Sequence, residues 1–425
     1  MLDIKFIREN PDIVRATLKN KNREVDLDRV LQLADERKEA AQKVSDLNRK
    51  KNEAAAARDI EAGKAVKDEL KAAEEAHATL EKELVSLLIK IPNVPSPDTP
   101  IGPDESGNVV AREWGEKPQF SFKPKEHWEL GKDLGIIDTE KASEVSGARF
   151  AYLKGPLVML EMALMDFAWK TLTSKEKLAG IIKDAGLSVS DKPFVPVIPP
   201  LLMRAQVMNR MARLDPIDER YYFEKDEMVF IGSAEHTLGP LHMDETLPED
   251  AFPLRYVALT PAFRREAGSY GKDTKGILRL HQFNKMEMES FTKPEDGMQE
   301  QDLMVAIQEY FMRALKLPYR VMSICTGDMG FPDHRQIDID AWMPGQDTYR
   351  ETHTSDYMGG FQARRLNSRI KRTDGTIEPV HMNDATALSQ RPLIAIIENY
   401  QQEDGSIVVP EVLRSYMGTD VIRKN

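Results

Sequence analysis

The chain has 425 residues, with 59 Lys and Arg against 70 Asp and Glu, and its formal net charge of −11 at pH 7 argues against a protein that coats nucleic acid over its whole surface. The length allows two or three domains, and the single cysteine, Cys325, excludes an intramolecular disulfide and a cysteine-rich zinc site, so we expect a buried thiol and no zinc. No signal-peptide pattern and no apolar run of membrane-spanning length is present, which predicts a soluble cytoplasmic protein without membrane contact.

The first part of the chain predicts helices. Asn10-Pro11-Asp12 is typical of a helix N-terminus within residues 1–21. The second half of residues 27–91 has a coiled-coil seam with positions alternately four and three apart: Val66, Leu70, Ala73, His77, Leu80, Leu84, Leu87 and Ile91. The first half has a weaker seam: Leu27, Val30, Ala34, Ala41 and Val44, then polar Asn48 and Lys51. We expect two antiparallel helices of about 30 residues, roughly 45 Å long, with a turn at residues 59–64 that contains Gly63.

Two roles fit this helical hairpin. Heptads alone are equally typical of a dimerisation coiled coil. Near the predicted tip, however, basic side chains (Lys43, Arg49, Lys50, Lys51 and Arg58) outnumber Asp46 and Glu53. A basic tip on a rod of balanced charge suits contact with an RNA backbone, which is recognised mostly through shape and phosphates.

A proline-rich segment, residues 91–107, predicts a linker, so we expect an N-terminal arm and linker at 1–105 and a second domain at 106–425. Within the second domain, residues 147–172 predict a short strand and a helix that is apolar around its circumference. Such a helix is buried in a core or at a subunit interface. The segment 230–238, FIGSAEHTL, combines a small hydroxyl with a carboxylate.

Residues 259–289 predict a strand, a polar loop and a second strand. In residues 277–289, apolar side chains (Leu278, Leu280, Met286 and Met288) alternate with polar or aromatic ones (Arg279, His281, Phe283, Lys285, Glu287 and Glu289), as in a half-buried antiparallel strand. The loop has three glycines (Gly268, Gly271 and Gly276) and four basic residues (Arg264, Arg265, Lys272 and Lys275). Guanidinium groups suit phosphates and carboxylates, but a solvated hairpin with ordinary surface charges fits the periodicity equally well.

The amino-acid sequence of this hairpin, FRRE followed by RLHQFNKMEME, resembles motif 2 of class II aminoacyl-tRNA synthetases and in particular of seryl-tRNA synthetases. The resemblance covers nearly the whole chain: residues 147–172 resemble motif 1, which forms the dimer interface in that family, and 381–400 resemble motif 3. It implies an α+β protein, with a long antiparallel α-helical coiled-coil arm that binds tRNA and a catalytic domain built on an antiparallel β-sheet flanked by helices.

The implied activity is the ATP-dependent activation of L-serine and its transfer to the 3′ end of serine tRNA, and of selenocysteine tRNA where present, by a homodimer. The resemblance assigns catalytic roles to Arg264, Glu266 and Arg391. Arg264 would bridge the α-phosphate and the amino-acid carboxylate, Glu266 would hold the adenine amino group, and Phe283 and Arg391 would enclose the adenine. The implied ATP-binding set also contains Arg265, Leu280, Glu351, Thr352, His353 and Thr354.

Glu351 and Thr354 would hold Mg²⁺ with ATP, in agreement with the preference of Mg²⁺ for oxygen ligands. The implied serine site consists of Ser233, Ala234, Glu235, Arg264, Glu287, Asn383, Ala385 and Thr386. In it, Glu287 would accept a hydrogen bond from the serine hydroxyl and Glu235 would hold the ammonium group.

The sequence departs from the family pattern at several positions. Ser233 and Thr354 exchange one hydroxyl residue for another, while Asp340 replaces a glutamate and Pro392 a residue such as threonine. Ala385 falls where the family has a hydroxyl residue that contacts serine, and we expect the neighbouring Thr386 to supply that hydroxyl. Two alternatives are a paralogue that loads a carrier protein, which would lack the arm, and a non-catalytic RNA-binding regulator, which would not need Arg264, Glu266, Glu287 or Arg391.

Overall fold

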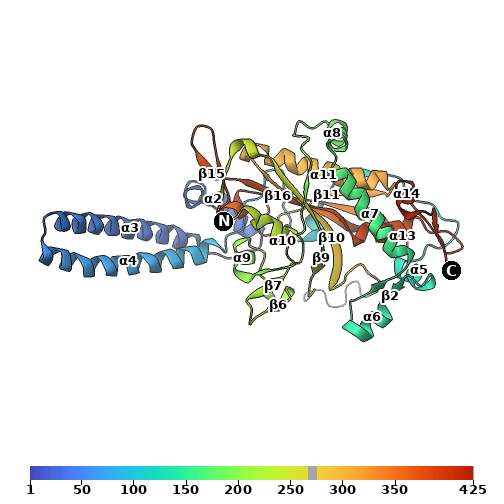
Figure 1. Cartoon of the computed structure of the whole chain (residues 1–425), viewed down its shortest axis with the longest axis horizontal. Coiled ribbons are helices and arrows are strands. Elements are labelled where there is room, and N and C mark those ends of the chain that lie inside the picture. Colours follow the sequence, from blue (N-terminus) through green and yellow to red (C-terminus); the bar gives the residue numbers. More distant parts are fainter. Residues whose placement is uncertain (267–274, 425) are drawn as a thin grey trace. The chain divides into compact units, whose positions relative to one another are not determined.

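The computed structural model describes residues 1–266 and 275–424, which divide into two compact units, Met1–Pro95 and Ser96–Asn425 (Figure 1). None of the helices in these ranges is long and apolar enough to cross a membrane. The glycines and lysine predicted for the centre of the loop, Gly268, Gly271 and Lys272, lie outside the described residues.

The first unit consists of two short helices, α1 (Ile4–Glu9) and α2 (Pro11–Asn20), and two long ones, α3 (Leu27–Ala56) and α4 (Ile60–Leu88), that pack side by side (Figure 1). Proline opens α2, as the sequence predicts. The side chains of Asp26 and Asp59 accept hydrogen bonds from the first turns of α3 and α4, at 3.0 Å each.

The predicted turn at 59–64 is wrong. Because Asp59 caps α4, Gly63 lies inside its first turn, and the chain reverses at residues 57–59, where Arg58 adopts a left-handed backbone (φ 57°). The predicted seam of α4 is correct, since its members are buried or half-buried. In α3 the predicted seam is correct at Leu27, Val30 and Ala34, which are buried. It is wrong at Ala41, Asn48 and Lys51, which are exposed, and Leu33, Leu47 and Ala54 are buried in addition.

The second unit begins within the proline-rich segment. The backbone N–H of Ser96 donates to the carbonyl of His334 (2.6 Å), and that of Thr326 donates to the carbonyl of Pro100 (2.9 Å). Cys325 is buried, as expected, and its Sγ contacts the carbonyl of Asp104 at 3.0 Å. Residues 96–107 are therefore part of the second unit rather than a free linker.

An eight-stranded sheet forms the centre of this unit, in the order β1-β11-β12-β13-β16-β10-β9-β4. All neighbours are antiparallel except β4 and β9, so the predicted antiparallel sheet is confirmed. The strands are β1 (Val109–Trp114), β4 (Val195–Pro196), β9 (Leu254–Phe263), β10 (Gln282–Thr292), β11 (Tyr319–Ser323), β12 (Arg335–Met343), β13 (Thr348–Gly359) and β16 (His381–Ser389).

One face of the sheet is apolar and is covered by α7 (Pro156–Leu172), α11 (Gly297–Ala314) and α13 (Gln390–Asn399) (Figure 1). Side chains of alternate residues reach this core: Met286 and Met288 from β10, Ile337, Ile339 and Ala341 from β12, and Ala385 and Ala387 from β16. The residues between them point to the opposite face. Two glutamines of α11 bind the backbones of β13 and β16 from the apolar face. Gln308 donates to the carbonyls of Thr354 and Thr386, and Gln301 donates to that of Ser355, all at 2.9 Å.

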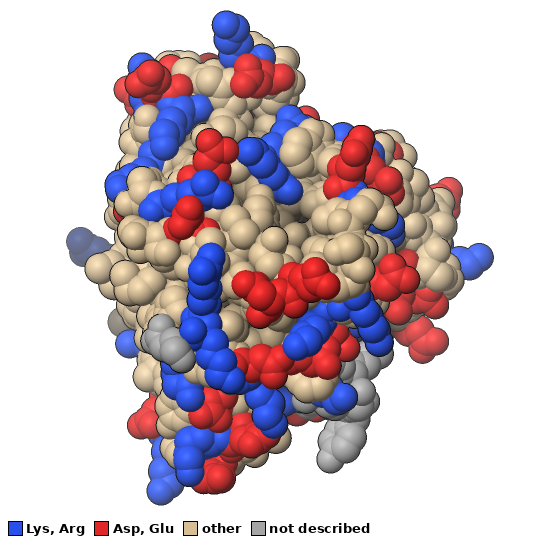
Figure 2. Space-filling model, turned by 90° about the vertical axis from the view of Figure 1, so that its right-hand side faces the viewer, with Lys and Arg blue, Asp and Glu red and all other residues tan. Residues whose placement is uncertain are grey.

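Smaller elements surround the sheet. The helices are α5 (His127–Asp133), α6 (Thr139–Ser146), α8 (Lys175–Asp184), α9 (Ala205–Arg210), α10 (Glu235–Leu238), α12 (Phe361–Leu366) and α14 (Arg414–Met417). The strands are β2 (Ile137–Asp138), β3 (Tyr152–Leu153), β5 (Leu202–Arg204), β6 (Tyr222–Phe223), β7 (Met228–Phe230), β8 (Thr246–Pro248), β14 (Arg369–Lys371), β15 (Ile377–Pro379), β17 (Ile407–Val408) and β18 (Val421–Ile422). Acidic and basic side chains are interspersed on the face shown in Figure 2.

Candidate active site

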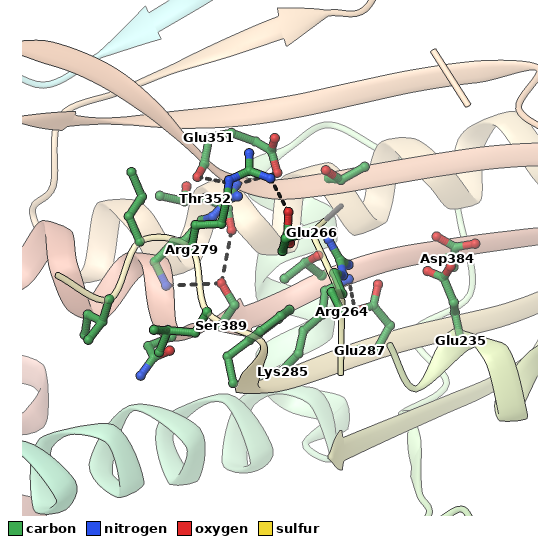
Figure 3. A pocket seen from close by; sticks show the side chains of 18 of the residues that line it. Glu235, Arg264, Glu266, Arg279, Lys285, Glu287, Glu351, Thr352, Asp384 and Ser389 are labelled. Atoms are coloured by element: carbon green, nitrogen blue, oxygen red, sulfur yellow. Dashed lines mark hydrogen bonds and ion pairs between the residues drawn. The ribbon is translucent and has the colours of Figure 1, made fainter. Parts of the chain in front are cut away.

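A cavity of about 180 Å³ opens on the polar face of the sheet, above β10, β13 and β16 (Figure 3). Its walls carry charges of both signs. The lining residues are Arg213, Glu235, Arg264, Glu266, Ile277, Leu278, Arg279, Leu280, Phe283, Lys285, Glu287, Glu351, Thr352, Thr354, Asp356, Asp384, Thr386, Ser389, Gln390 and Arg391. Most of the predicted site residues therefore surround one space, although they come from segments up to 156 residues apart in the chain.

Arg264 follows directly after β9 and lies near the middle of the cavity wall. Its backbone N–H donates to the carbonyl of His281 (3.0 Å), and its own carbonyl lies 2.9 Å from His281 Nδ1. Its Nε donates to the carbonyl of Gly232 (3.1 Å). The guanidinium also lies 5.4 Å from the centroid of the Phe283 ring. Arg264 also lines the cavity. Figure 3 shows Arg264 between an end marked by Glu351 and an end marked by Glu235 and Asp384.

The strand after the loop is shorter than predicted. It begins at Gln282, whereas alternation in the sequence begins at Ile277. Residues 277–281 are irregular, because the N–H of Ile277 donates to the side chain of His127 (3.1 Å) and that of His281 donates to the carbonyl of Arg149 (2.9 Å) instead of to a neighbouring strand. This irregular segment allows Leu278 and Leu280 to line the cavity, although alternation places both side chains on the apolar face. For Leu280 the position agrees with its place in the implied ATP-binding set.

Two ion pairs cross the Glu351 end, which we call the nucleotide half. Glu266 pairs with Arg279, and Arg391 Nη1 pairs with Glu351 Oε1 at 2.8 Å. Glu266 has a left-handed backbone (φ 52°), which turns its carboxylate toward Arg279. Glu351 and Thr354 both line the cavity from β13, so a carboxylate and a hydroxyl lie near each other there.

The opposite end, which we call the acidic half, is formed around Arg213. Arg213 Nε lies 3.4 Å from Glu235 Oε1, and its Nη2 lies 3.3 Å from Asp356 Oδ2 and 3.4 Å from Asp384 Oδ2. Burial alone would raise the pKa of Glu235, but Arg213 and His236 outweigh it and hold the pKa well below its usual value. Burial, together with Glu235 and Asp356, raises the pKa of Asp384 well above its usual value.

Lys285 and Glu287 form the floor of the acidic half. Lys285 Nζ lies 2.6 Å from Glu287 Oε2 and donates to Ser233 Oγ at 3.2 Å. Burial raises the pKa of Glu287 even though Lys285 opposes the shift. Ser233 does not line the cavity and is connected to it by this hydrogen bond from Lys285. Ala234 packs with Leu238 and Ala258 in a small apolar cluster.

The register of β16 decides which of its residues face the cavity. Glu287 pairs with Thr386 and Met288 with Ala385 across the β10–β16 ladder, so Thr386 faces the cavity and Ala385 belongs to the apolar core. Asn383 has the same orientation as Ala385 and is fully buried. A bulge next to Glu287 leaves one extra residue of β16 unpaired and sets this register.

The predicted site and the observed cavity lining differ at several positions. Arg265 is exposed and His353 is buried beside Thr352, and neither lines the cavity. Burial lowers the pKa of His353 to about 3. Several lining residues are not in the predicted site, among them Arg213, Asp356 and Asp384. Asp384 carried a signal, because alternation with Thr386 places both on one face, whereas Arg213 lies in irregular chain without a motif.

The comparisons with known proteins agree with this geometry. Residues 221–400 match the family described as tRNA synthetase class II core domain (G, H, P, S and T). Residues 1–95 match the seryl-tRNA synthetase N-terminal domain. The cavity-lining residues from Glu235 to Arg391 all fall within the first match, so the fold and cavity are those of a class II aminoacyl-tRNA synthetase.

Individual relatives indicate which family within this class the chain belongs to. The serine–tRNA ligases of Thermodesulfovibrio yellowstonii and Rhizobium etli are 39% and 40% identical to the chain, over 100% and 98% of both proteins. The crystal structure of seryl-tRNA synthetase from Pyrococcus horikoshii complexed with ATP has a TM-score of 0.88 at 33% identity and covers 100% of both chains. The cytoplasmic serine–tRNA ligase of Naegleria fowleri in complex with AMP has a TM-score of 0.86 at 28% identity, over 100% of this chain and 99% of that one. The chain belongs to the seryl-tRNA synthetase family.

Proposed function

We propose that the protein is a serine–tRNA ligase, which activates L-serine with ATP to seryl-adenylate and transfers the seryl group to the 3′ end of serine tRNA. The observation that carries this proposal is the division of one cavity into a nucleotide half with Arg264, Arg279 and Arg391 and an acidic half with Glu235, Glu287 and Asp384. Cationic groups suit the phosphates of ATP, and buried carboxylates suit the ammonium and hydroxyl groups of serine.

Arg264 is placed to act where the two substrates meet. In the first step a carboxylate oxygen of serine attacks the α-phosphorus of ATP and pyrophosphate leaves. Arg264 would hold the serine carboxylate and the α-phosphate together and stabilise the charge that develops between them. Catalysis by this chain is therefore positioning and electrostatic stabilisation, with no covalent protein intermediate.

The adenine would lie between Phe283 and Arg391, with the backbone of Leu280 and the carboxylate of Glu266 at its edge. Binding requires an exchange of partners, because Glu266 now pairs with Arg279 and Arg391 with Glu351. Arg279 and Arg391 would then turn to the phosphates while Glu266 accepts from the adenine amino group. Such exchanges cost little, since each charged group gains a new partner.

Glu351 and Thr354 fit a magnesium ion bound together with ATP. Both line the nucleotide half, and a carboxylate with a hydroxyl is the hard oxygen set that Mg²⁺ prefers. When bound, the ion would neutralise phosphate charge. Arg391 now contacts the carboxylate and the backbone carbonyl of Glu351, and it would release that carboxylate to the ion when it turns to the phosphates.

Serine would occupy the acidic half. Glu235, kept ionised by Arg213, would accept from the α-ammonium group, and Glu287 and Thr386 would contact the side-chain hydroxyl. The pocket penalises alanine, because an amino acid without a hydroxyl leaves buried polar groups unpaired.

The helical arm formed by α3 and α4 would bind serine tRNA. Lys50, Lys51 and Arg58 lie at its tip and are exposed, and the match of residues 1–95 to the family's N-terminal domain supports this role. Transfer of serine to tRNA also supports the expected cytoplasmic location.

A homodimer is also part of this proposal. Helix α7 leaves Met159 (54%) and Met162 (43%) exposed, and Ile198, next to the edge strand β4, is 96% exposed. Exposed apolar side chains of this size on neighbouring elements are typical of a protein interface.

Amino-acid-dependent ATP–pyrophosphate exchange with the purified protein tests the activation step. We expect exchange with serine that exceeds the exchange with threonine, alanine or glycine by at least about a hundredfold in kcat/KM. Exchange that prefers one of the other amino acids, or no exchange with any of them, would contradict the proposal.

A further inference from the structure

The acidic half of the cavity contains more carboxylates than cationic side chains. Four carboxylates line it, those of Glu235, Glu287, Asp356 and Asp384, but only two cationic side chains do, Arg213 and Lys285. All four carboxylate residues are at most 8% exposed. Buried charges are stable only when paired, so this part of the cavity lacks positive charge.

The two cations are already shared. Lys285 lies against Glu287 at 2.6 Å. Arg213 is divided between three of the lining carboxylates, at 3.3 to 3.4 Å from each, and also lies 3.7 Å from Asp333. A buried oxygen of Asp356, Oδ1, accepts no hydrogen bond from the described residues. A cation from outside the chain would supply the missing positive charge.

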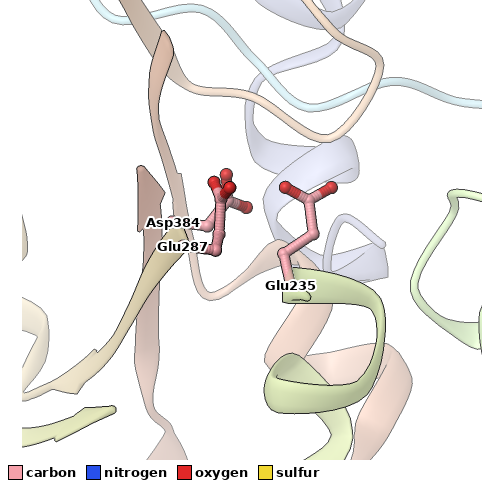
Figure 4. A group of neighbouring side chains, drawn as sticks. All are labelled: Glu235, Glu287 and Asp384. Carbon is pink, nitrogen blue, oxygen red and sulfur yellow. The ribbon is translucent and has the colours of Figure 1, made fainter. Parts of the chain in front are cut away.

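Glu235, Glu287 and Asp384 converge on one point. Each offers a carboxylate oxygen, and the three oxygens lie within 4.8 Å of one another. Figure 4 shows the carboxylates of Glu287 and Asp384, from β10 and β16, facing that of Glu235 from α10. Three acceptors arranged tetrahedrally at about 2.8 Å around an ammonium nitrogen lie about 4.6 Å apart, which agrees with this spacing.

We propose that Asp384 is a serine-binding residue, which accepts a hydrogen bond from the α-ammonium group of the substrate together with Glu235 and Glu287. This inference rests on the proposed function and adds a specificity-determining residue to it. An ammonium group has three N–H donors, one for each carboxylate. Each carboxylate has several lone pairs, so Glu287 can serve the serine hydroxyl as well.

Electrostatics favour an ammonium group over a divalent metal ion as the occupant. The guanidinium of Arg213 lies 3.4 Å from both Glu235 and Asp384 and would repel a doubly charged ion between them. The raised pKa of Asp384 agrees with a carboxyl group that still lacks a cationic partner. Arg213 acts as a positioning residue, because it holds the carboxylates of α10, β13 and β16 around one point.

Asp384→Asn tests the proposal, since it keeps the shape of the side chain and removes its charge. The probes are sulfamoyl-adenosine analogues of the adenylate that carry a seryl, an alanyl or a 3-hydroxypropanoyl group. The last of these lacks the ammonium group. In the variant, the preference for the seryl over the 3-hydroxypropanoyl analogue should fall at least tenfold. The preference for seryl over alanyl should change less than twofold, as should the KM for ATP.

Glu289→Gln is the matched control. Glu289 is a buried carboxyl two residues from Glu287 on the same strand but does not line the cavity, so Glu289→Gln changes a buried carboxyl group outside the proposed ammonium site. This control should keep the preference for the ammonium group within twofold of the parent protein. Asp384→Ser, smaller and uncharged, is a second test variant that should behave as Asp384→Asn.

Three results would overturn the proposal. One is an unchanged ammonium preference in Asp384→Asn. Another is loss of folding or of ATP affinity in both Asp384 variants, which would give Asp384 a structural role. A third is an affinity of the parent protein for the seryl analogue that collapses in EDTA, which would assign the three carboxylates to a metal ion. If the parent protein itself does not prefer the seryl analogue over the alanyl one, the proposed function fails rather than this inference.

Discussion

At the scale of single residues, the register of β16 separates two neighbouring side chains with different roles. Thr386 faces the cavity beside Glu287, while Ala385 packs into the apolar core. The sequence places Ala385 where the family has a hydroxyl, and the structure shows that its side chain points away from that space. The oxygen available to serine from this part of the strand is therefore that of Thr386.

Thr386→Val keeps the shape of the side chain and removes its oxygen. The expected result is a five- to hundredfold fall in kcat/KM for serine with little change in the KM for ATP, because a buried hydrogen bond of roughly 1–3 kcal/mol is lost. Pyrophosphate exchange at varied serine and ATP concentrations measures both.

Ala385→Ser is the companion variant. It places a hydroxyl in an apolar core, so it should lower the free energy of unfolding by about 1–3 kcal/mol and leave the serine KM unchanged. Serine kinetics that respond to Ala385→Ser and not to Thr386→Val would show that Ala385 is the residue near the substrate.

Arg264 is the residue on which the activation step depends most in this account. Arg264→Ala should reduce pyrophosphate exchange at least about a hundredfold, as expected for the loss of one preorganised donor. Arg264→Lys keeps the charge but not the planar fork and should recover only part of the rate. Exchange by the alanine variant within a few-fold of the parent protein would remove Arg264 from the mechanism.

Local patterns in the sequence identify part of this site. Period-two alternation is sufficient for Phe283, Lys285 and Glu287, because β10 is regular there. It cannot identify Arg213, whose role arises from contacts with Glu235, Asp356 and Asp384, 22 to 171 residues further along the chain. Alternation does place Thr386 and Ala385 on opposite faces of β16, but it does not say which face is the core, and the bulge that sets the register with β10 cannot be predicted from it.

At the scale of elements, the arm combines a packed base with an exposed basic tip. Arg29 pairs with Glu83 at 2.8 Å and Arg37 with Glu81 at 3.0 Å, which tie α3 to α4 along the rod. Lys50 and Lys51 are exposed near the reversal at residues 57–59.

Changing Lys50 and Lys51 together to alanine should raise the KM for serine tRNA by roughly tenfold and weaken its dependence on salt, since each phosphate contact releases counterions. Pyrophosphate exchange should be unaffected. Lys175 and Lys183 of α8, also exposed, form the matched control pair. A control pair that weakens tRNA binding as much as the tip pair would contradict the assignment of RNA contact to the tip.

Heptad spacing predicts α4 well because Leu70, Ala73 and Leu84 are strongly apolar seam positions. In α3 it is correct only for the first part, at Leu27, Val30 and Ala34. Farther along α3, alanine and polar residues make several seams equally plausible, and contact with α4 decides between them. The turn between α3 and α4 is predicted too late in the chain because the prediction relies on Gly63. The side chain of Asp59 is the stronger signal, since it caps α4 four residues before that glycine.

At the scale of the whole molecule, the proposed dimer surface includes α7 and the chain after β4. Changing Met159 and Ile198 to glutamate would place charges in that interface and should convert a dimer into a monomer in sedimentation velocity runs. Ile377→Glu changes an exposed isoleucine of β15 (53%) and should leave the dimer intact. A parent protein that sediments as a monomer would remove the dimer from the account.

The most direct test of the central claim is the charging of unfractionated tRNA with a mixture of amino acids, followed by mass spectrometry of the aminoacyl-adenosine released from the tRNA 3′ end. We expect seryl-adenosine as the dominant product. We expect it to be lost when residues 28–90 are replaced by a short linker, while serine-dependent exchange continues. Serine activation without any charged tRNA, or charging with another amino acid, would contradict the account.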